Sequence, residues 1–332
     1  CAMKKTAAKG KLPPHVALII LIPVILVLLL LNTGWLQGMV PAVTVYGQSY
    51  SALEFRYYFY DAYYDYVNEH AEHLAELPRN VLFLFQPSEE TTGGAGKLCE
   101  SGVLERYRVR RIFGLHLWPG LEAGTIASRP GPLMARSNEV TVTVEGRSVH
   151  MSRADEGLDA LTAGISYLQR AYDMMEQLPP DQPRVLRFGK MVSGTVRNAI
   201  SGRTVLEGSL RTYREDTFRF CRQQLKDIGR SVAAETGCSL DVHLSEGYPA
   251  VWNHEELYQK IAAQLGDNAP TLMEKPVLAA EDFSFYQQYV PGLFFFLGTG
   301  DTPQLHAPDF TFDDEAVLPR GVEFLKKLLM LP

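Results

Sequence analysis

The chain has 332 residues, of which 46% are hydrophobic and 21% charged, and its formal net charge is −6. This apolar fraction excludes intrinsic disorder, and the length is sufficient for one large or two ordinary domains with a sizeable core. A mildly acidic chain lacks the basic footprint of a nucleic-acid-binding protein, so no nucleic-acid partner is expected. The four cysteines are too few for a disulfide scaffold, and they form no CxxC motif.

The first forty residues predict a membrane anchor. An unbroken apolar run, VALIILIPVILVLLLL, covers 16–31 and extends to Leu36, which gives about 20 residues, enough to cross a bilayer. Four lysines precede it without an acidic residue among them: Lys4, Lys5, Lys9 and Lys11. The positive-inside rule keeps these lysines in the cytoplasm, so we expect a single-pass membrane protein whose globular part is extracytoplasmic. A cleaved signal peptide is the alternative.

Residues 41–77 predict a short strand and an aromatic helix. The strand covers Val43–Gly47, and a capping box of Ser51 and Glu54 begins a helix over Ala52–Leu77. The stretch AVTVYGQSYSALEFRYYFYDAYYDY, after an apolar anchor, makes residues 1–66 resemble the N-terminus of membrane-anchored parvulin-type foldases. No isomerase domain follows it.

The remaining chain predicts an α/β domain. Three continuous apolar runs are typical of strands buried on both faces: Val81–Phe85, Ile112–Leu117 and Leu293–Leu297. Helical patterns over His254–Leu265 and Glu315–Leu329 accompany these strands. We therefore expect an open, mostly parallel sheet with helices, formed by residues 78–135 and 247–332.

Residues 136–246 predict a second domain inserted into the first. Alternating valines make Val140–Val144 a half-buried strand, and apolar residues at helical spacing predict a helix over Leu158–Leu178. A second helix is expected to stop at Gly237, a favourable C-terminal cap. Three further strands complete the unit: Val185–Val192, Thr204–Tyr213 and Leu240–Leu244. The resulting β-α-β-β-α-β order is that of a ferredoxin-like domain.

Carboxylates and histidines follow the three apolar runs. Glu89 and Glu90 come after the first run, His116 belongs to the second, and His306 follows the third. Ligands of open α/β sheets bind at the carboxyl ends of the strands, so these side chains are expected to converge there. Glutamate and two histidines are a suitable donor set for a zinc-type ion, and the neighbouring glutamate can take a proton from water.

Several separated blocks resemble the metal-dependent amidohydrolases of the aminoacylase–carboxypeptidase family. The blocks are FQPSEETTGGAGKLCESGVL, GLHLWPGLEAGTIASRPGPLMA, VEGRSVHMSR, AEDFSFY and LHAPDFTFDDEAVLPRGV. The resemblance covers Leu77–Leu331 and is to the branch with hippurate hydrolase, auxin-conjugate hydrolase and N-acetyl-diaminopimelate deacetylase. It implies a two-metal catalytic domain, an inserted lid domain through which the chain forms a homodimer, and hydrolysis of N-acyl amino acids or small amides.

The resemblance also implies roles for individual residues. Glu89 corresponds to the general base, and three residues correspond to ligands of zinc or manganese: Glu90, His116 and His306. In the lid, His150 corresponds to a histidine that reaches the substrate or its oxyanion, often across the dimer. Asn198 and Arg211 correspond to residues that hold the substrate carboxylate. The block Glu281–Phe283 matches a further active-site motif to which no role is given.

One block of the family pattern is missing. A sequence of the kind His-Ala-Cys-Gly-His-Asp should precede FQPSEE and supply further metal ligands, but none occurs here. We therefore expect an incomplete metal site, in a natural truncated fusion or a mis-joined gene product. Two other functions stay open: a catalytically inactive binding or dimerisation module, and an anchored foldase-like chaperone.

Overall fold

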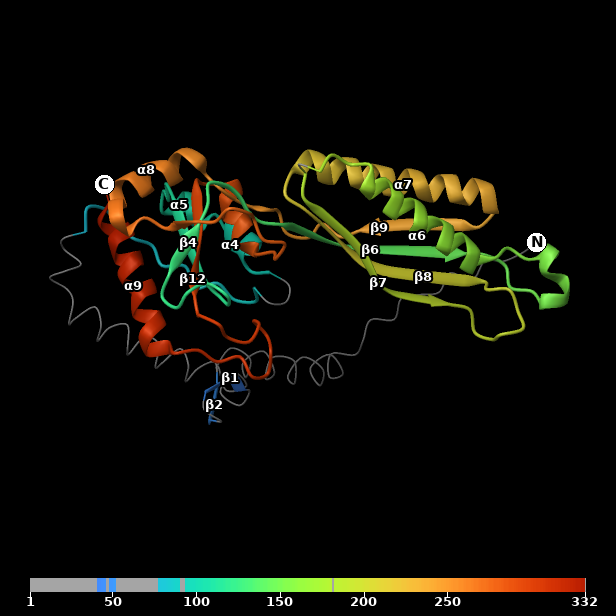
Figure 1. Cartoon of the computed structure of the whole chain (residues 1–332), viewed down its shortest axis with the longest axis horizontal. Coiled ribbons are helices and arrows are strands. Elements are labelled where there is room, and N and C mark those ends of the chain that lie inside the picture. Colours follow the sequence, from blue (N-terminus) through green and yellow to red (C-terminus); the bar gives the residue numbers. More distant parts are fainter. Residues whose placement is uncertain (1–40, 46–47, 52–76, 90–92, 181, 332) are drawn as a thin grey trace, which may run out of the picture. The chain divides into compact units, whose positions relative to one another are not determined.

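A computed structural model of the chain describes residues 41–45, 48–51, 77–89, 93–180 and 182–331 (Figure 1). The chain divides into two units, Cys1–Leu77 and Pro78–Pro332. In the first unit, β1 (Pro41–Val45) and β2 (Gln48–Ser51) pair as an antiparallel hairpin. The aromatic helix expected after Ser51 lies outside the described residues, as does most of the stretch that resembles a foldase.

The predicted transmembrane helix, and the membrane localisation that followed from it, require correction. Over the described ranges, no helix combines the length and the apolar character that crossing a bilayer requires. The long helix α7 (Glu215–Thr236) illustrates the reason, since its 22 residues bury one face and expose charged side chains on the other. The apolar run over 16–36 itself lies outside the described residues.

Outside residues 136–246, the second unit is built on a four-stranded sheet, and this portion is here called the catalytic part after the family it resembles. Its strands are β3 (Ile112–Trp118), β4 (Ile126–Ser128), β11 (Thr271–Leu272) and β12 (Gly292–Gly298), in the order β11-β4-β12-β3. The sheet expected to be open and mostly parallel is mixed: β12 is parallel to β3 and β11 is parallel to β4, whereas β12 and β4 are antiparallel. A short connection between β3 and β4, with Gly120 and Gly124 at positive φ, reverses the chain and makes the sheet mixed. Elsewhere β5 (Gly131–Met134) and β10 (Val251–Asn253) form a separate pair.

The strand expected at Val81–Phe85 is not formed. This segment is extended but pairs with no strand in the described part of the chain. Phe83 and Phe85 are 61% and 67% exposed, whereas a central strand would bury both faces. The apolar run alone could not reveal this, because a strand also requires a neighbour for its backbone hydrogen bonds.

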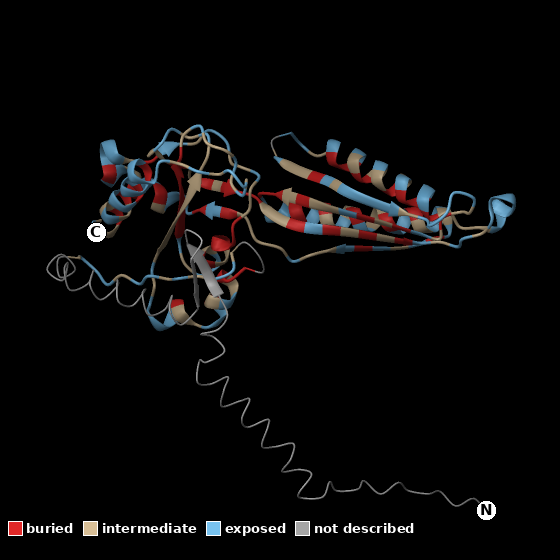
Figure 2. Cartoon of the chain, turned by 90° about the horizontal axis from the view of Figure 1, so that it is seen from below, coloured by how far each residue is buried: buried red, intermediate tan, exposed pale blue. Residues whose placement is uncertain are grey.

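Strand β12 is the centre of the catalytic core, and all of its residues are buried (Figure 2). On one face, Phe295 packs with α8 (Glu255–Leu265) and α9 (Asp314–Met330). On the other face, Phe294 and Phe296 pack with α4 (Ala95–Glu100), α5 (Val103–Arg106) and the 3₁₀ segment η3 (Asp282–Gln288). Both helices predicted beside this sheet are thus observed within one residue of their expected starts.

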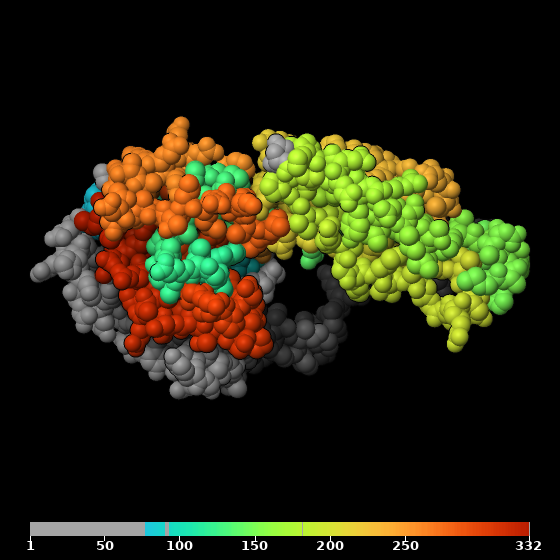
Figure 3. All heavy atoms as spheres, in the orientation of Figure 1, coloured from blue at the N-terminus to red at the C-terminus, as the bar shows by residue number. Residues whose placement is uncertain are grey.

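Residues 136–246, here called the lid, contain four strands and two long helices. They follow one another as β6 (Arg136–Glu145), α6 (Ala160–Glu176), β7 (Arg184–Ser193), β8 (Arg203–Thr212), α7 and β9 (Ser239–Leu244). The strands form an antiparallel sheet in the order β7-β8-β6-β9, and α6 and α7 share one core with it. Figure 3 shows the outer side of α6 as part of a continuous lid surface. Helix α7 ends at Gly237, whose φ of 73° is left-handed.

Candidate metal centre

Three carboxylates meet where the segment after Val81–Phe85 contacts η3. Glu89, Glu281 and Asp282 each offer an oxygen, and these oxygens all lie within 4.8 Å of one another. Glu89 belongs to a turn before α4, and Glu281 caps the start of η3. In the part of the chain that the structure describes, this three-carboxylate group is the one cluster of three or more metal-capable side chains at this spacing.

Asp282 acts as an anchor within this group. The carboxylate is fully buried, and the Gln86 side chain donates to both of its oxygens at 2.7 and 2.8 Å. The backbone amides of Gly94 and Ala95 donate to Oδ2 at 2.8 and 3.1 Å, so Asp282 also caps the first turn of α4. Because both of its oxygens accept hydrogen bonds, Asp282 is the most constrained of the three carboxylates.

The orientation of the Gln86 side-chain amide is set by a second hydrogen bond, from Tyr286. The Tyr286 hydroxyl donates to Gln86 Oε1 at 2.8 Å, which orients the amide so that its nitrogen faces Asp282. Burial raises the pKa of Tyr286, so this hydroxyl keeps its proton and remains a donor. The chain Tyr286–Gln86–Asp282 therefore holds the Glu89 turn against η3 by buried polar contacts.

Glu281 lies in an environment that opposes its negative charge. It is only 7% exposed, and the backbone amide of Phe283 donates to it at 3.4 Å. Burial, and next the negative charge of Glu89, raise the pKa of Glu281 to about 8. Two neighbouring carboxylates repel one another, and a divalent cation would relieve that repulsion. The donor set therefore fits such an ion.

The Glu89 turn has an unusual backbone. Ser88 has a φ of 65°, a left-handed conformation that is uncommon outside glycine, and its carbonyl accepts from the Gly93 amide at 2.9 Å. Gly93, at a φ of 74°, completes the turn. Strained residues of this kind concentrate at functional sites. Glu90, the expected metal ligand next to Glu89, lies outside the described residues.

The two histidines expected to bind metal are not members of the three-carboxylate group. His116 lies within β3 rather than after it, paired with Phe296 of β12. Its Nδ1 is 2.7 Å from the Leu117 carbonyl, which can only accept, so Nδ1 carries the proton and Nε2 is left as the possible ligand. His306 lies in the loop after β12 with a φ of 67°. Neither histidine contributes a donor to the cluster of Glu89 and Glu281.

The lid residues occupy two places. His150 forms a β-bridge with Ala199, and the Met151 amide donates to the Asn198 carbonyl at 3.0 Å, so the structure brings His150 and Asn198 together. The Nδ1 atom of His150 is 2.9 Å from the Ser152 hydroxyl. Arg211 lies elsewhere, on β8, and its Nη1 donates to the Leu278 carbonyl at 2.6 Å. It is thus tied to the segment that leads to Glu281.

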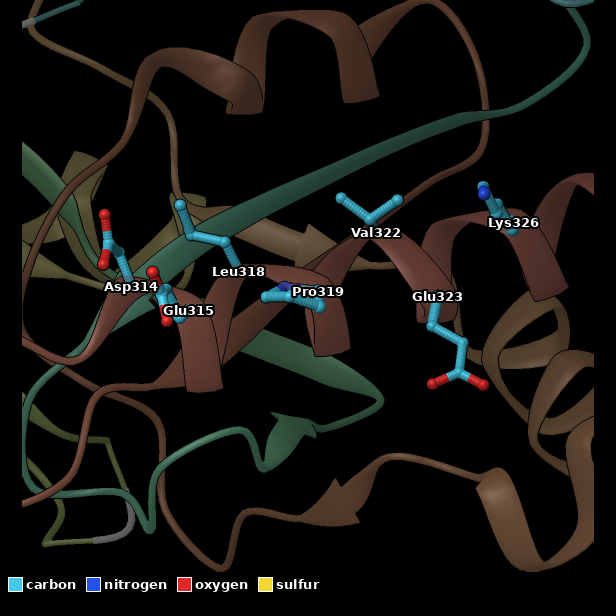
Figure 4. A pocket seen from close by; sticks show the side chains of 7 residues that line it. All are labelled: Asp314, Glu315, Leu318, Pro319, Val322, Glu323 and Lys326. Carbon is cyan, nitrogen blue, oxygen red and sulfur yellow. The ribbon is translucent and has the colours of Figure 1, made fainter. Parts of the chain in front are cut away.

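Two surface hollows lie away from the carboxylates. The larger, about 640 Å³, runs along α9 and has walls formed by side chains of that helix (Figure 4). Its lining residues are Asp314, Glu315, Leu318, Pro319, Val322, Glu323 and Lys326. The smaller, about 330 Å³, lies in the lid, and its lining includes Ser148 and Ala199, which flank the His150–Asn198 pair. Only the second hollow is near an expected site residue.

Sequence reasoning missed the residues that hold the site together. The Gln86 side chain forms hydrogen bonds with Asp282 and with Tyr286, which lie 196 and 200 positions further along the sequence. Asp282 belongs to the block AEDFSFY, but its neighbour Glu281 is also charged, so the sequence did not mark it as a buried, fully bonded carboxylate. No sequence signal identified Gln86 as its partner.

Known proteins resemble this chain over most of its length. The N-acetyldiaminopimelate deacetylase of Lacticaseibacillus paracasei is 34% identical over 246 residues, covering 72% of this chain and 64% of that protein. The enzyme of the same name from Exiguobacterium sibiricum is 33% identical over 248 residues, covering 74% and 67%. This chain therefore spans a little under two thirds of the length of the first relative.

Solved structures also resemble this chain over most of its length. A dinuclear metal-binding peptidase of the M20 family from Bacillus subtilis superposes with a TM-score of 0.63 at 27% identity, covering 79% of this chain and 67% of that one. The aminobenzoyl-glutamate utilization protein from Klebsiella pneumoniae shares the fold, with a TM-score of 0.57 at 19% identity over 79% of this chain and 64% of that one. The model of Peptidase family M20/M25/M40 matches residues 62–331, and the chain belongs to that family.

Proposed function

We propose that this chain hydrolyses the amide bond of N-acyl amino acids, using a divalent cation, zinc or manganese. Family membership supports amide hydrolysis, and the deacetylase names of the relatives support an N-acyl amino acid as substrate. The observation that carries the proposal is the pair Glu89 and Glu281, two neighbouring carboxylates of which one is buried with a raised pKa.

The cation would be held at this carboxylate pair. Oxygen donors suit both zinc and manganese, and a positive charge between Glu89 and Glu281 would offset their repulsion. We keep Glu90, His116 and His306 as proposed ligands on the strength of the family resemblance. The metal-binding title of the Bacillus subtilis neighbour supports a divalent metal here as well.

Glu89 would carry the proton transfers. A divalent cation, when bound, lowers the pKa of water and polarises an amide carbonyl. Glu89 accepts the proton from the attacking water and returns it to the amide nitrogen as the carbon–nitrogen bond breaks, so the products are a carboxylate and an amine. Its turn is held from both ends, by the Gln86–Asp282 contacts and by the Ser88–Gly93 hydrogen bond, which keeps this carboxylate in place.

The lid would contribute the remaining contacts. His150 would donate to the developing oxyanion, and its neighbour Asn198 would bind the substrate carboxylate. Arg211 would bind the same carboxylate through the guanidinium nitrogens that the Leu278 carbonyl leaves available. These three residues come from one domain, so substrate would be enclosed only when the lid and the catalytic part act together.

We also propose that the chain forms a homodimer through the lid. Ile165 on α6 and Val192 on β7 are 53% and 55% exposed, and a Cβ atom added to Gly164 would lie 3.3 Å from the Met191 side chain. Strand β7 is an edge strand of the lid sheet, with backbone groups available to a second copy. Exposed apolar side chains beside a sheet edge are typical of an association surface.

The experiment is acetate release from N-acetyl amino acids, N-acetyldiaminopimelate among them, by purified chain with excess zinc or manganese. We expect turnover that a chelator abolishes and added metal restores. Equilibrium dialysis should show metal bound to the parent and less bound to Glu90→Gln, because that change removes a charged ligand. A chain that binds neither zinc nor manganese would contradict the proposal and favour an inactive module.

A further inference from the structure

Tyr248 links the lid to the turn that carries Glu89. It lies between β9 and β10, on the segment that returns the chain from the lid to the catalytic part. Its hydroxyl donates to the backbone carbonyl of Glu89 at 3.3 Å. We infer that Tyr248 is a positioning residue, which fixes the Glu89 turn and couples it to the lid hinge. This inference rests on the proposed function only for the role of Glu89.

The Tyr248 ring packs between the two segments that bring the carboxylates together. It makes an edge-to-face contact with Phe285 of η3, with centroids 6.0 Å apart. On the turn side, a Cβ atom added to Gly93 would lie 3.1 Å from the Tyr248 ring and hydroxyl and 3.3 Å from Asp282. The ring therefore occupies the space beside Gly93, which fixes the hydroxyl near the Glu89 carbonyl.

The backbone of Tyr248 belongs to the hinge. Its amide donates to the Ser137 carbonyl at 3.2 Å and its carbonyl accepts from the Ser137 amide at 3.3 Å. Ser137 lies at the start of β6, where the chain enters the lid, so this bridge joins the entering and returning segments. Gly247 makes the approach possible, because a Cβ atom there would come within 1.8 Å of the Ser137 carbonyl.

The same hinge also contacts the segment before Glu281. Ser137 is the register partner of Arg211, which donates to the Leu278 carbonyl at 2.6 Å. The Ala135 amide, just before β6, donates to the Ala279 carbonyl at 2.8 Å. The hinge thus contacts both chain segments of the three-carboxylate group, and Tyr248 provides the contact on the Glu89 side.

The test compares Tyr248→Phe with Tyr172→Phe in the full chain. Both variants lose one hydroxyl bonded to a backbone group, but Tyr172 lies in the lid core, where its hydroxyl accepts from Phe188 at 3.2 Å. We expect amide hydrogen exchange over 86–95 of the metal-free protein to become about 5-fold faster in Tyr248→Phe, the effect of one lost hydrogen bond of about 1 kcal/mol. The Tyr172→Phe variant should leave that segment unchanged.

The kinetics of acetate release provide the second readout. In Tyr248→Phe we expect kcat to fall about 10-fold with little change in KM, because the base is misplaced while substrate contacts remain. Unchanged exchange over 86–95, or faster exchange spread over the whole chain, would overturn the inference. If the parent releases no acetate, the proposed function fails, yet the exchange comparison in the metal-free protein still decides the role of Tyr248.

Discussion

The Gln86 side-chain nitrogen donates to both carboxylate oxygens of Asp282, at 2.7 and 2.8 Å. These residues are 196 positions apart, and the contact joins the turn of Glu89 to η3. Since Val81–Phe85 pairs with no strand among the described residues, this contact and its neighbours help to hold the turn in place. The geometry of the proposed site therefore depends on a few buried polar groups.

Asp282→Asn should destabilise the catalytic part of the chain. The new amide would turn a donor toward the amides of Gln86 or Gly94, where only an acceptor fits. We expect the free energy of unfolding to fall by about 3 kcal/mol, because charged hydrogen bonds are lost and buried donors are left unpaired. Urea denaturation measures it, with the exposed Asp267→Asn as control. A loss equal to that of the control would contradict the anchor role.

Glu281 predicts a pH dependence of the metal-free protein. Its pKa is about 8 in the folded chain against an ordinary value of 4.5, so the folded state binds the extra proton between these values. This contribution to stability is complete below about pH 4.5 and is lost as the pH rises through 8. Urea denaturation with chelator from pH 5 to 8 should show this fall, which Glu281→Gln should remove and Glu256→Gln should not. A parent slope no different from that of Glu281→Gln would argue against the burial of this charge.

Arg184 predicts a separate effect on the lid. Its guanidinium donates to carbonyls at the end of α6 and in the following loop: Met175, Leu178, Pro179 and Gln182. Arg184→Ala should lower the free energy of unfolding by about 2–3 kcal/mol, since these carbonyls lose a charged donor. Arg184→Lys should recover little, because an ammonium group cannot reproduce the planar fork. Chemical denaturation measures the free energy of unfolding of these variants, with the exposed Lys226→Ala as control. If Arg184→Ala and Lys226→Ala lose the same stability, the hydrogen bonds of Arg184 to these carbonyls do not stabilise the lid.

The proposed dimer predicts a contrast between two exposed apolar residues. Ile165 of the lid and Val322 of α9 are 53% and 52% exposed, so glutamate can replace either without entering a core. Sedimentation equilibrium of the full chain should give a dimer for the parent and for Val322→Glu. Ile165→Glu should shift the mass toward the monomer, because burying a charge in the interface is costly. A monomeric parent at high concentration would remove this proposal and any role of His150 across a dimer.

The sequence predicted those elements whose signals are local. Gly237 marked the end of α7, His254 marked the start of α8, and the apolar run over Leu293–Leu297 corresponds to the fully buried β12. Val81–Phe85 has the same apolar character but forms no strand, because pairing depends on a neighbour that an apolar run does not specify. The antiparallel placement of β4 was missed for the same reason.

The candidate site was predictable in part. Motif resemblance singled out Glu89, and the structure places beside it Glu281, which the sequence had noted without a role. The sequence could not show that Asp282 accepts hydrogen bonds from Gln86, Gly94 and Ala95, since those bonds exist only in the folded chain. The expected convergence of His116 and His306 on the carboxylates assumed that three strand ends meet at one edge, but Val81–Phe85 forms no strand and His116 lies within β3.

The most direct test of the proposed function is the turnover of Glu89→Gln against the parent with excess zinc or manganese. Glutamine preserves the size of the side chain but cannot take up a proton at this position. We expect acetate release from an N-acetyl amino acid to fall about 10²–10⁴-fold, with the fold unchanged, when the excess of metal keeps the site of the variant occupied. If the parent is active and Glu89→Gln is equally active, Glu89 is not the base and the account of this site is wrong.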